Sequence, residues 1–282
     1  MRRPLAQTSV RDALDSAIIA LTAAGCDTPR LDAELLLAVA MGTGRAALVA
    51  DPGASVAPDA ARTFQAYAAR RREREPVAYI LGTKGFRSIE LEVDPRVLIP
   101  RPETEHLVDA VLEVEERGRV VDVGTGSGAI ALALKAERPD LEVIATDASP
   151  EALEVAAANA KRLGLEVRLR EGDLLAGVTG SLAAVVSNPP YVEDGAVLAP
   201  EIARFEPALA LRAGPDGLDV LRRLVPAIGV STACLAALEV GAGQAAAVAA
   251  LLREAGFPVV ATIRDLAGIE RVVAGRRPPE SC

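Results

Sequence analysis

Aromatic residues are scarce in this chain of 282 residues, which has four phenylalanines, three tyrosines and no tryptophan. Proteins that hold unpaired bases usually stack them on aromatic side chains. Acidic residues also outnumber basic ones, 39 to 31, so the formal net charge is −8. Both features argue against a protein that wraps nucleic acid over a wide basic surface. We therefore expect no stable direct binding to nucleic acid.

Cysteine and histidine are equally rare. The three cysteines lie far apart in sequence and form no CxxC or Cys/His pattern, so we expect no metal site and a reducing, cytoplasmic location. His106 is the single histidine, which excludes mechanisms that need two imidazoles and favours a structural role. The apolar N-terminal residues are interrupted by Asp12 and Asp15, so we expect no membrane partner.

The first 74 residues carry the apolar spacing of amphipathic helices and predict a separate helical bundle. Helices are expected at about 10–24, 29–42, 45–50 and 58–74. Ser9 should cap the first helix, with Asp12 completing a capping box. The second helix carries Leu31, Leu35 and Val39 on one face.

A cluster of arginines ends the fourth predicted helix. Its members are Arg70, Arg71, Arg72 and Arg74. The favoured interpretation is that these side chains are solvated and interact with the negative end of the helix dipole. The alternative is a patch that docks a partner.

The rest of the chain predicts an α/β architecture. Residues 75–100 suggest a β-hairpin linker with a turn at Asp94 and Pro95. Residues 101–282 alternate strand and helix, which is typical of a doubly wound, mostly parallel sheet. Strands are expected at 120–123, 142–146, 166–170, 183–187, 233–240, 259–263 and 270–273, and helices at 128–135, 150–163, 218–228 and 244–255. The last two strands lie too close for a crossover helix and predict an antiparallel edge hairpin.

The segment "VVDVGTGSGAIALAL" predicts a nucleotide-type loop between the first strand of this sheet and its helix. Glycines at 124, 126 and 128 allow a tight turn and close approach of a ligand. The loop also satisfies the dinucleotide fingerprint GxGxxA, and Asp147 lies where an acid would hold a ribose diol in either case. The loop alone therefore leaves a nicotinamide or flavin cofactor open.

Two acidic positions favour S-adenosylmethionine. Asp122 lies near the end of the first strand, where a carboxylate suits an ammonium and sulfonium group but repels a pyrophosphate. Asp173 and Leu174 follow the third strand and offer an acid and a backbone N–H for an adenine edge. A simple turn is the alternative for Asp173 considered alone.

The stretch "SNPPY" ends the fourth strand beside the first, so Asn188 should project into the same crevice. An amide or exocyclic nitrogen is a poor nucleophile because its lone pair is conjugated. Acceptors that hold both N–H groups would orient that lone pair. Asn188 supplies a side-chain oxygen, the rigid Pro189 supplies a carbonyl, and Tyr191 offers a flat wall. A plain proline turn is the alternative.

Together these residues resemble class I methyltransferases that act on planar nitrogens. The segments "REPVAYILGTKGF", "VLIPRPETEHLV", "FEPALALRAGPDGLD", "LEVGAGQAAAV" and "RDLAGIERVV" are similar to the peptide chain release factor glutamine N5-methyltransferase family. The similarity runs from about 74 to 276, and Gly85 and Arg87 depart from the pattern that we expect of the hairpin. The resemblance implies methyl transfer from S-adenosylmethionine to the glutamine of the Gly-Gly-Gln loop of class I peptide chain release factors.

The resemblance also implies domains and site residues. It suggests a substrate-docking domain at 1–74, a hairpin linker at 75–100 and a Rossmann-like class I methyltransferase domain at 101–282. The implied donor-binding residues are Asp122, Gly124, Thr125, Gly126, Ser127, Gly128, Asp147, Asp173, Leu174 and Asn188. The implied catalytic residues are Asn188, Pro189, Pro190 and Tyr191. The implied substrate rim is formed by Pro100, Arg101, Pro102 and Glu103. Alternatives are an adenine- or guanine-directed DNA or RNA methyltransferase and a nucleotide-sensing module without catalysis.

Overall fold

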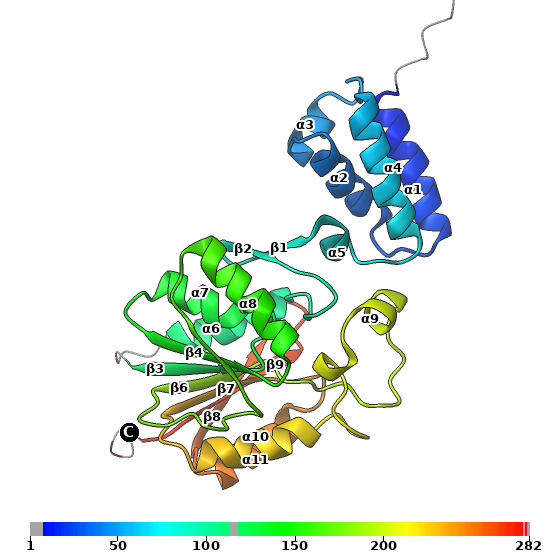
Figure 1. Cartoon of the computed structure of the whole chain (residues 1–282). Coiled ribbons are helices and arrows are strands. Elements are labelled where there is room, and N and C mark those ends of the chain that lie inside the picture. Colours follow the sequence, from blue (N-terminus) through cyan, green and yellow to red (C-terminus); the bar gives the residue numbers. More distant parts are fainter. Residues whose placement is uncertain (1–7, 113–117, 279, 281–282) are drawn as a thin grey trace, which may run out of the picture. The chain divides into compact units, whose positions relative to one another are not determined.

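The computed structural model describes residues 8–112, 118–278 and 280. These residues form two compact units (Figure 1). The helical unit comprises the chain up to Gly82 together with Ala199–Phe205, and the α/β unit comprises Thr83–Leu198 and the chain from Glu206 onward. A short segment encoded in the middle of the second unit therefore belongs to the first.

The helical unit is a bundle of helices around an apolar core. Its helices are α1 (Val10–Ala23), α2 (Pro29–Ala40), α3 (Arg45–Ala50), α4 (Pro58–Arg72), α5 (Val77–Leu81) and α9 (Pro200–Phe205). Ser9 caps α1 as predicted, because its Oγ accepts a hydrogen bond from the amide of Asp12 at 3.1 Å and the Asp12 carboxylate accepts one from the amide of Ser9. Leu21, Leu37 and Phe64 are among the buried side chains of the core.

The buried face of α2 differs from the predicted one. Leu31 and Val39 are 38 % and 50 % exposed, whereas Ala33, Leu36 and Leu37 are fully buried. The reason is that α2 is apolar on most of its circumference, so hydrophobic spacing alone does not select one face. Ion pairs select it instead, because Asp32 and Glu34 of α2 point inward to arginines of the same unit.

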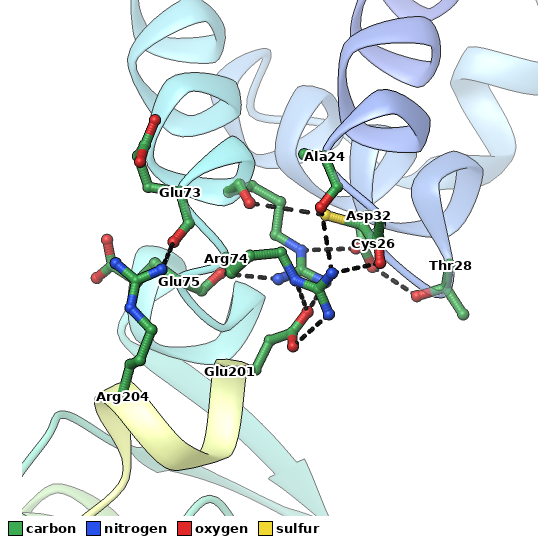
Figure 2. A network of polar contacts seen from close by, with 11 residues as sticks. Ala24, Cys26, Thr28, Asp32, Glu73, Arg74, Glu75, Glu201 and Arg204 are labelled. Carbon is green, nitrogen blue, oxygen red and sulfur yellow. Dashed lines mark hydrogen bonds and ion pairs between the residues drawn. The ribbon is translucent and has the colours of Figure 1, made fainter. Parts of the chain in front are cut away.

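The arginine cluster at the end of α4 also differs from the prediction (Figure 2). Arg71 is buried and its Nε donates to Asp32 Oδ2 at 2.7 Å, while its Nη2 donates to Glu201 Oε1 of α9 at 2.9 Å. Arg74 donates from Nε and Nη2 to the two carboxylate oxygens of Glu201 at 2.7 and 2.6 Å. The interpretation as a solvated cluster was wrong for these two arginines, which bind α9 to the bundle.

The α/β unit is built on a seven-stranded sheet in the order β5-β4-β3-β6-β7-β9-β8. Its strands are β3 (Arg119–Val123), β4 (Glu142–Asp147), β5 (Arg168–Glu171), β6 (Ala184–Ser187), β7 (Leu235–Glu239), β8 (Val259–Arg264) and β9 (Glu270–Arg276). The first five are parallel, whereas β9 pairs antiparallel with both β7 and β8, which confirms the predicted edge hairpin.

Helices cover both faces of the sheet. They are α6 (Glu105–Leu112), α7 (Ala129–Glu137), α8 (Pro150–Leu163), α10 (Asp219–Gly229) and α11 (Ala245–Glu254), with 3-10 turns η1 (Pro102–Thr104) and η2 (Ala208–Ala210). Figure 1 shows α6, α7 and α8 on one side and α10 and α11 on the other. Leu221, Leu224 and Leu252 pack on the second side in a fully buried cluster. In the described part of the chain, no helix has the length and apolar composition needed to cross a bilayer.

The β-hairpin lies earlier in the chain than the turn signal predicted. Its strands are β1 (Thr83–Phe86) and β2 (Ile89–Glu92), so the turn is at Arg87 and Ser88 and the prediction at Asp94 and Pro95 was wrong. The chain turns at Asp94 as well, where the carboxylate accepts from the amide of Arg96 at 2.9 Å, but no strand follows. Arg87 adopts the left-handed conformation (φ = 49°) and forms ion pairs with Asp109 and Glu137.

Candidate active site

A cavity of about 540 Å³ lies in the α/β unit at the carboxyl ends of the parallel strands. This is where open α/β sheets bind ligands, and the volume is within the range of small-molecule sites. The cavity is lined by residues 123–127 after β3, 147–149 after β4, 172–174 after β5 and 187–190 after β6. Four loops that are far apart in sequence therefore meet at one site.

The glycine loop presents open backbone to this cavity. Gly124 and Gly126 have φ values of 72° and 55°, and a Cβ atom at either position would meet no atom within 4 Å. The amides of Gly124 and Thr125 donate to the carbonyl of Thr146 at 2.8 and 3.0 Å, which fixes the loop on β4. Gly128 differs, because a Cβ there would contact Leu132 at 2.9 Å. Gly128 therefore serves helix packing, whereas the other two leave room for a ligand.

Asp147 lies on the cavity wall and also holds the loop. Its Oδ2 accepts from the amide of Gly126 at 2.9 Å, and its Oδ1 accepts from the amide of Ser149 at 2.9 Å. A carboxylate oxygen has more than one lone pair. Asp147 can therefore keep these bonds and still accept hydrogen bonds from a diol in the cavity.

Asp122 is not part of the cavity wall, which differs from the expectation that its carboxylate faces a cationic ligand. It is fully buried behind the loop, where Oδ2 accepts from Thr125 Oγ1 at 2.6 Å and from the amide of Ala131 at 3.1 Å. Oδ1 has no hydrogen-bond partner among the described residues. Burial raises the pKa of Asp122 from 3.8 to about 7. The residue ties the loop to the start of α7.

Asp173 and Leu174 line the cavity at the end of β5. The Asp173 carboxylate is exposed and forms an ion pair with Arg223 of α10, which also lines the cavity. Leu174 has the left-handed conformation (φ = 55°), and its carbonyl accepts from Thr146 Oγ1 at 2.9 Å. The carbonyl of Thr146 also accepts from the glycine loop, so Thr146 anchors both segments that line the cavity.

Asn188, Pro189 and Pro190 line the cavity next to the glycine loop. Ser187 fixes the end of β6, because its Oγ donates to the carbonyl of Val123 at 2.6 Å. The Asn188 side chain is oriented by Thr104, since Nδ2 donates to Thr104 Oγ1 at 3.1 Å. The other end of the amide, Oδ1, is therefore the end available to accept a hydrogen bond from a ligand.

Tyr191 is not among the cavity-lining residues, in contrast to its predicted role as a flat wall. Its hydroxyl donates to Glu239 Oε1 at 3.2 Å, and its carbonyl accepts from Gln244 Nε2 at 3.0 Å. Burial raises the pKa of Tyr191, and the nearby carboxylate of Glu239 raises it further. Burial also raises the pKa of Glu239 from 4.5 to about 7, while the nearby hydroxyls of Thr104 and Tyr191 lower it.

The predicted substrate rim is only partly at the cavity. Pro100 lines it, but Arg101, Pro102 and Glu103 do not. Arg101 forms an ion pair with the buried Glu206, whose Oε2 also accepts from the amide of Ile99 at 3.2 Å. Arg101 therefore fixes the chain beside the cavity.

Sequence reasoning gave no role to Thr104, Glu239 or Gln244. All three lie within segments that carried the family resemblance, "VLIPRPETEHLV" and "LEVGAGQAAAV". That resemblance was the only available signal, because the contacts of these residues with Asn188 and Tyr191 join positions about 50 to 85 residues apart.

Comparison with known proteins identifies the family. Residues 12–82 match the PrmC N-terminal domain, and residues 103–205 match the methyltransferase small domain. The release factor glutamine methyltransferase of Caulobacter vibrioides is 44 % identical over 266 residues, which cover 91 % of this chain and 92 % of that protein. The enzyme of the same name from Deinococcus radiodurans is 45 % identical over 276 residues, covering 95 % and 98 %. The chain belongs to the release factor glutamine methyltransferase family.

Solved structures resemble this member of the release factor glutamine methyltransferase family in fold. A methyltransferase from Pyrococcus furiosus has 17 % sequence identity to this chain and a TM-score of 0.52. The match covers 76 % of this chain and 97 % of the Pyrococcus chain. The T. thermophilus 16S rRNA methyltransferase RsmC, in complex with AdoMet and guanosine, has 17 % identity and a TM-score of 0.50, covering 70 % of this chain and 50 % of its own. The fold is the Rossmann-like fold of class I methyltransferases, as predicted.

Proposed function

We propose that this chain transfers a methyl group from S-adenosylmethionine to the side-chain amide nitrogen of the glutamine in the Gly-Gly-Gln loop of class I peptide chain release factors. The family supports the reaction, since relatives with this name align over nearly their whole length. The observation that carries the proposal is the Asn188 amide, held by Thr104 with its Oδ1 end available beside the glycine loop. The reaction takes place in the cytoplasm, where release factors act.

Features of the cavity support S-adenosylmethionine as the methyl donor. Gly124 and Gly126 leave open backbone where a side chain would fill the space. We assign the ribose diol to Asp147 and the adenine to the segment of Asp173 and Leu174. The donor supplies a methyl group on a positively charged sulfur. Asp122 contributes indirectly, by holding Thr125 and the start of α7.

The protein's contribution to the chemistry is to orient the glutamine amide. An amide nitrogen is weakly nucleophilic because its lone pair is conjugated with the carbonyl. We assign one substrate N–H to Asn188 Oδ1 and the other to the carbonyl of Pro189, which is held rigidly between two ring-constrained residues. Fixed acceptors of this kind turn the nitrogen lone pair toward the methyl group and stabilise the positive charge that develops on nitrogen.

The helical unit is the proposed docking domain for the release factor, because it adds surface without contributing to the described cavity. Binding energy from a remote part of a protein substrate can position the reacting group. The nucleic-acid alternative is not favoured, since the RNA methyltransferase RsmC shares only the fold with this chain at 17 % identity.

The test is incubation of the purified protein with methyl-labelled S-adenosylmethionine and one of three acceptors, namely release factor, DNA or RNA. We expect label in the release factor, at the glutamine of its Gly-Gly-Gln loop by peptide mass spectrometry. A release factor whose glutamine is replaced by glutamate is the matched control and should remain unlabelled. Label in DNA or RNA but not in protein would overturn the proposal.

A further inference from the structure

Gln244 has no role in the reaction as described above, yet its side chain joins three loops of the α/β unit. It is half-buried and lies directly before α11. Nε2 donates to the carbonyl of Tyr191 at 3.0 Å and to the carbonyl of Asp216 at 3.2 Å, while Oε1 accepts from the amide of Gly241 at 2.8 Å. These partners lie after β6, before α10 and after β7. One side chain therefore connects the chain after the two prolines to two other loops.

The partners of Gln244 fix which way its amide points. A main-chain amide only donates and a carbonyl only accepts. A rotated Gln244 would set its N–H groups against the amide of Gly241 and its oxygen against the carbonyls of Tyr191 and Asp216. Both N–H protons of the side chain are used by the two carbonyls. The position therefore needs an acceptor at one end and two donors at the other, a requirement that glutamine meets and glutamate does not.

Two glycines leave the space that these contacts need. Gly217 has a φ of 72°, and a Cβ atom there would overlap the carbonyl oxygen of Tyr191 and lie 2.7 Å from Gln244 Nε2. A Cβ atom at Gly241 would lie 2.9 Å from Gln244 Oε1 and 3.3 Å from Cδ2 of the Tyr191 ring. Close approach of this kind requires residues without a side chain. The backbone of both loops is therefore shaped around the contact between Gln244 and Tyr191.

The peptide group between Tyr191 and Val192 is held at both edges. Gln244 binds its carbonyl, and the amide of Val192 donates to the carbonyl of Leu211 at 2.8 Å. The two prolines before it have no N–H to anchor them, and their rings fix φ but leave ψ free. Contacts on either side of the prolines must therefore set the direction of their carbonyls. On the preceding side the anchor is Ser187, at the end of β6.

We propose that Gln244 is a positioning residue: by holding the Tyr191 carbonyl, it fixes the direction of the Pro189 carbonyl at the cavity. The inference rests on the proposed function, in which that carbonyl accepts one N–H of the substrate amide. Pro189 lines the cavity, whereas Gln244 does not. Gln244 therefore acts through the main chain and has no contact with the donor or the substrate.

The first test is Gln244→Glu. Glutamate keeps the length of the side chain and an acceptor for Gly241, but it loses both donors and turns a negative charge toward two carbonyls. We expect kcat for release-factor methylation to fall about tenfold or more, because a misplacement of about 1 Å can cost a hundredfold. KM and the dissociation constant of S-adenosylmethionine should change little, and Gln65→Glu at an exposed position of α4 should retain the parental kcat. A Gln244→Glu enzyme with parental kcat would overturn the inference.

The second test displaces the same carbonyl by a different route. Gly217→Ala places a methyl group where the Tyr191 carbonyl oxygen lies, so kcat should fall here too. Gly195→Ala is the matched control, because Gly195 follows the prolines in the same loop and a Cβ atom there meets no atom within 4 Å. The dissociation constant of S-adenosylmethionine should stay near the parental value in both variants. A Gly217→Ala enzyme as active as Gly195→Ala would contradict the inference.

A third measurement observes the Tyr191 carbonyl without release factor. The chain has three tyrosines, so labelling them with ¹³C at the carbonyl gives three resonances, and Tyr191→Phe identifies one of them by its loss. Loss of a hydrogen bond shifts a carbonyl resonance upfield, so the Tyr191 signal should move in Gln244→Glu and not in Gln65→Glu. An unmoved signal in Gln244→Glu would show that Gln244 does not hold this carbonyl. A parental enzyme inactive on release factor would instead refute the proposed function.

Discussion

Asn188 is the residue on which the proposed chemistry depends most directly. Asn188→Ala removes the acceptor while leaving Gly124, Gly126 and Asp147 in place, so donor binding should change little. Methyl transfer should fall roughly a hundredfold or more, the loss typical of removing one preorganised hydrogen-bonding group at a reacting centre. The loss should appear in kcat, because added substrate cannot restore an interaction that matters in the transition state.

Single-turnover transfer to release factor, measured beside a donor titration, separates the two effects. A variant that transfers methyl at nearly the parental rate would show that Asn188 is only a turn residue. A variant that loses donor affinity to the same extent as activity would assign Asn188 to the donor site instead.

Asp147 supports a second prediction at the scale of single residues. Asp147→Ala should weaken S-adenosylmethionine binding by about 1 to 3 kcal/mol, the range for losing hydrogen bonds to a charged group. Part of this loss comes from the loop, since the amide of Gly126 loses its acceptor. Asp173→Ala should cost less, because the Asp173 carboxylate is exposed and already paired with Arg223. Calorimetric titration measures both, and an equal or reversed order would place the ribose elsewhere.

Among the elements, α9 is held in place mainly by charge. It has six residues and no buried side chain, so apolar packing contributes little to it. Glu201 instead forms ion pairs with Arg71 and Arg74 of the bundle (Figure 2). Burial alone would raise the pKa of Glu201, but hydrogen bonds from Arg74 and Arg71 lower it overall. The ionised form is therefore the one that holds α9.

Replacing Glu201 with glutamine should destabilise the helical unit by on the order of 3 kcal/mol, because Arg71 is buried and loses a charged partner. Arg204→Gln on the same helix is the matched control. It removes an exposed hydrogen bond to the carbonyl of Glu73 and a cation–π contact with the ring of Phe205, and should cost about 1 kcal/mol. Urea unfolding followed by circular dichroism gives the free energies. Hydrogen exchange should show α9 losing protection only in Glu201→Gln, and equal effects of the two variants would contradict the role of the ion pairs.

Helices and strands with a repeating apolar pattern were predictable from the sequence. Elements whose position depends on single tertiary contacts were not. The parallel strands, the glycine loop and the capped α1 follow from apolar runs and local capping signals. The short α5 and α9 lack a full amphipathic repeat, and the hairpin turn at Arg87 lacks the usual glycine or asparagine. In the site, residues next to a strand end could be anticipated, whereas Thr104 and Glu239 reach Asn188 and Tyr191 only through tertiary contacts.

For the whole molecule, two buried acids predict how stability depends on pH. Burial raises the pKa of Asp122 from 3.8 to about 7 and that of Glu239 from 4.5 to about 7. Between about pH 4.5 and 7 the folded state therefore binds more protons than the unfolded state, so the free energy of unfolding should fall as pH rises through this window. Carboxyls with lowered pKa values, such as Asp94 and Glu142, act in the opposite direction but below about pH 4.5.

Urea unfolding at several pH values tests this dependence. The parental slope should become shallower in Glu239→Gln, because one of the two titrating groups is gone, while the exposed control Glu254→Gln should keep it. A parental stability that rises between pH 5 and 7 would show that the two acids ionise in the folded protein as easily as in the unfolded chain.

Because α9 belongs to the helical unit, cutting the chain at a single position cannot separate the two units. The bundle formed by the N-terminal residues is completed by a helix encoded after the Asn-Pro-Pro-Tyr stretch. A chain shortened to begin at Thr83 would leave Glu201 without Arg71 and Arg74. A chimera that takes its first 82 residues from a relative would place that relative's residues, in place of Arg71 and Arg74, against the Glu201 of this chain. Exchange of the helical unit between members of the family thus requires two separate segments of the gene to move together.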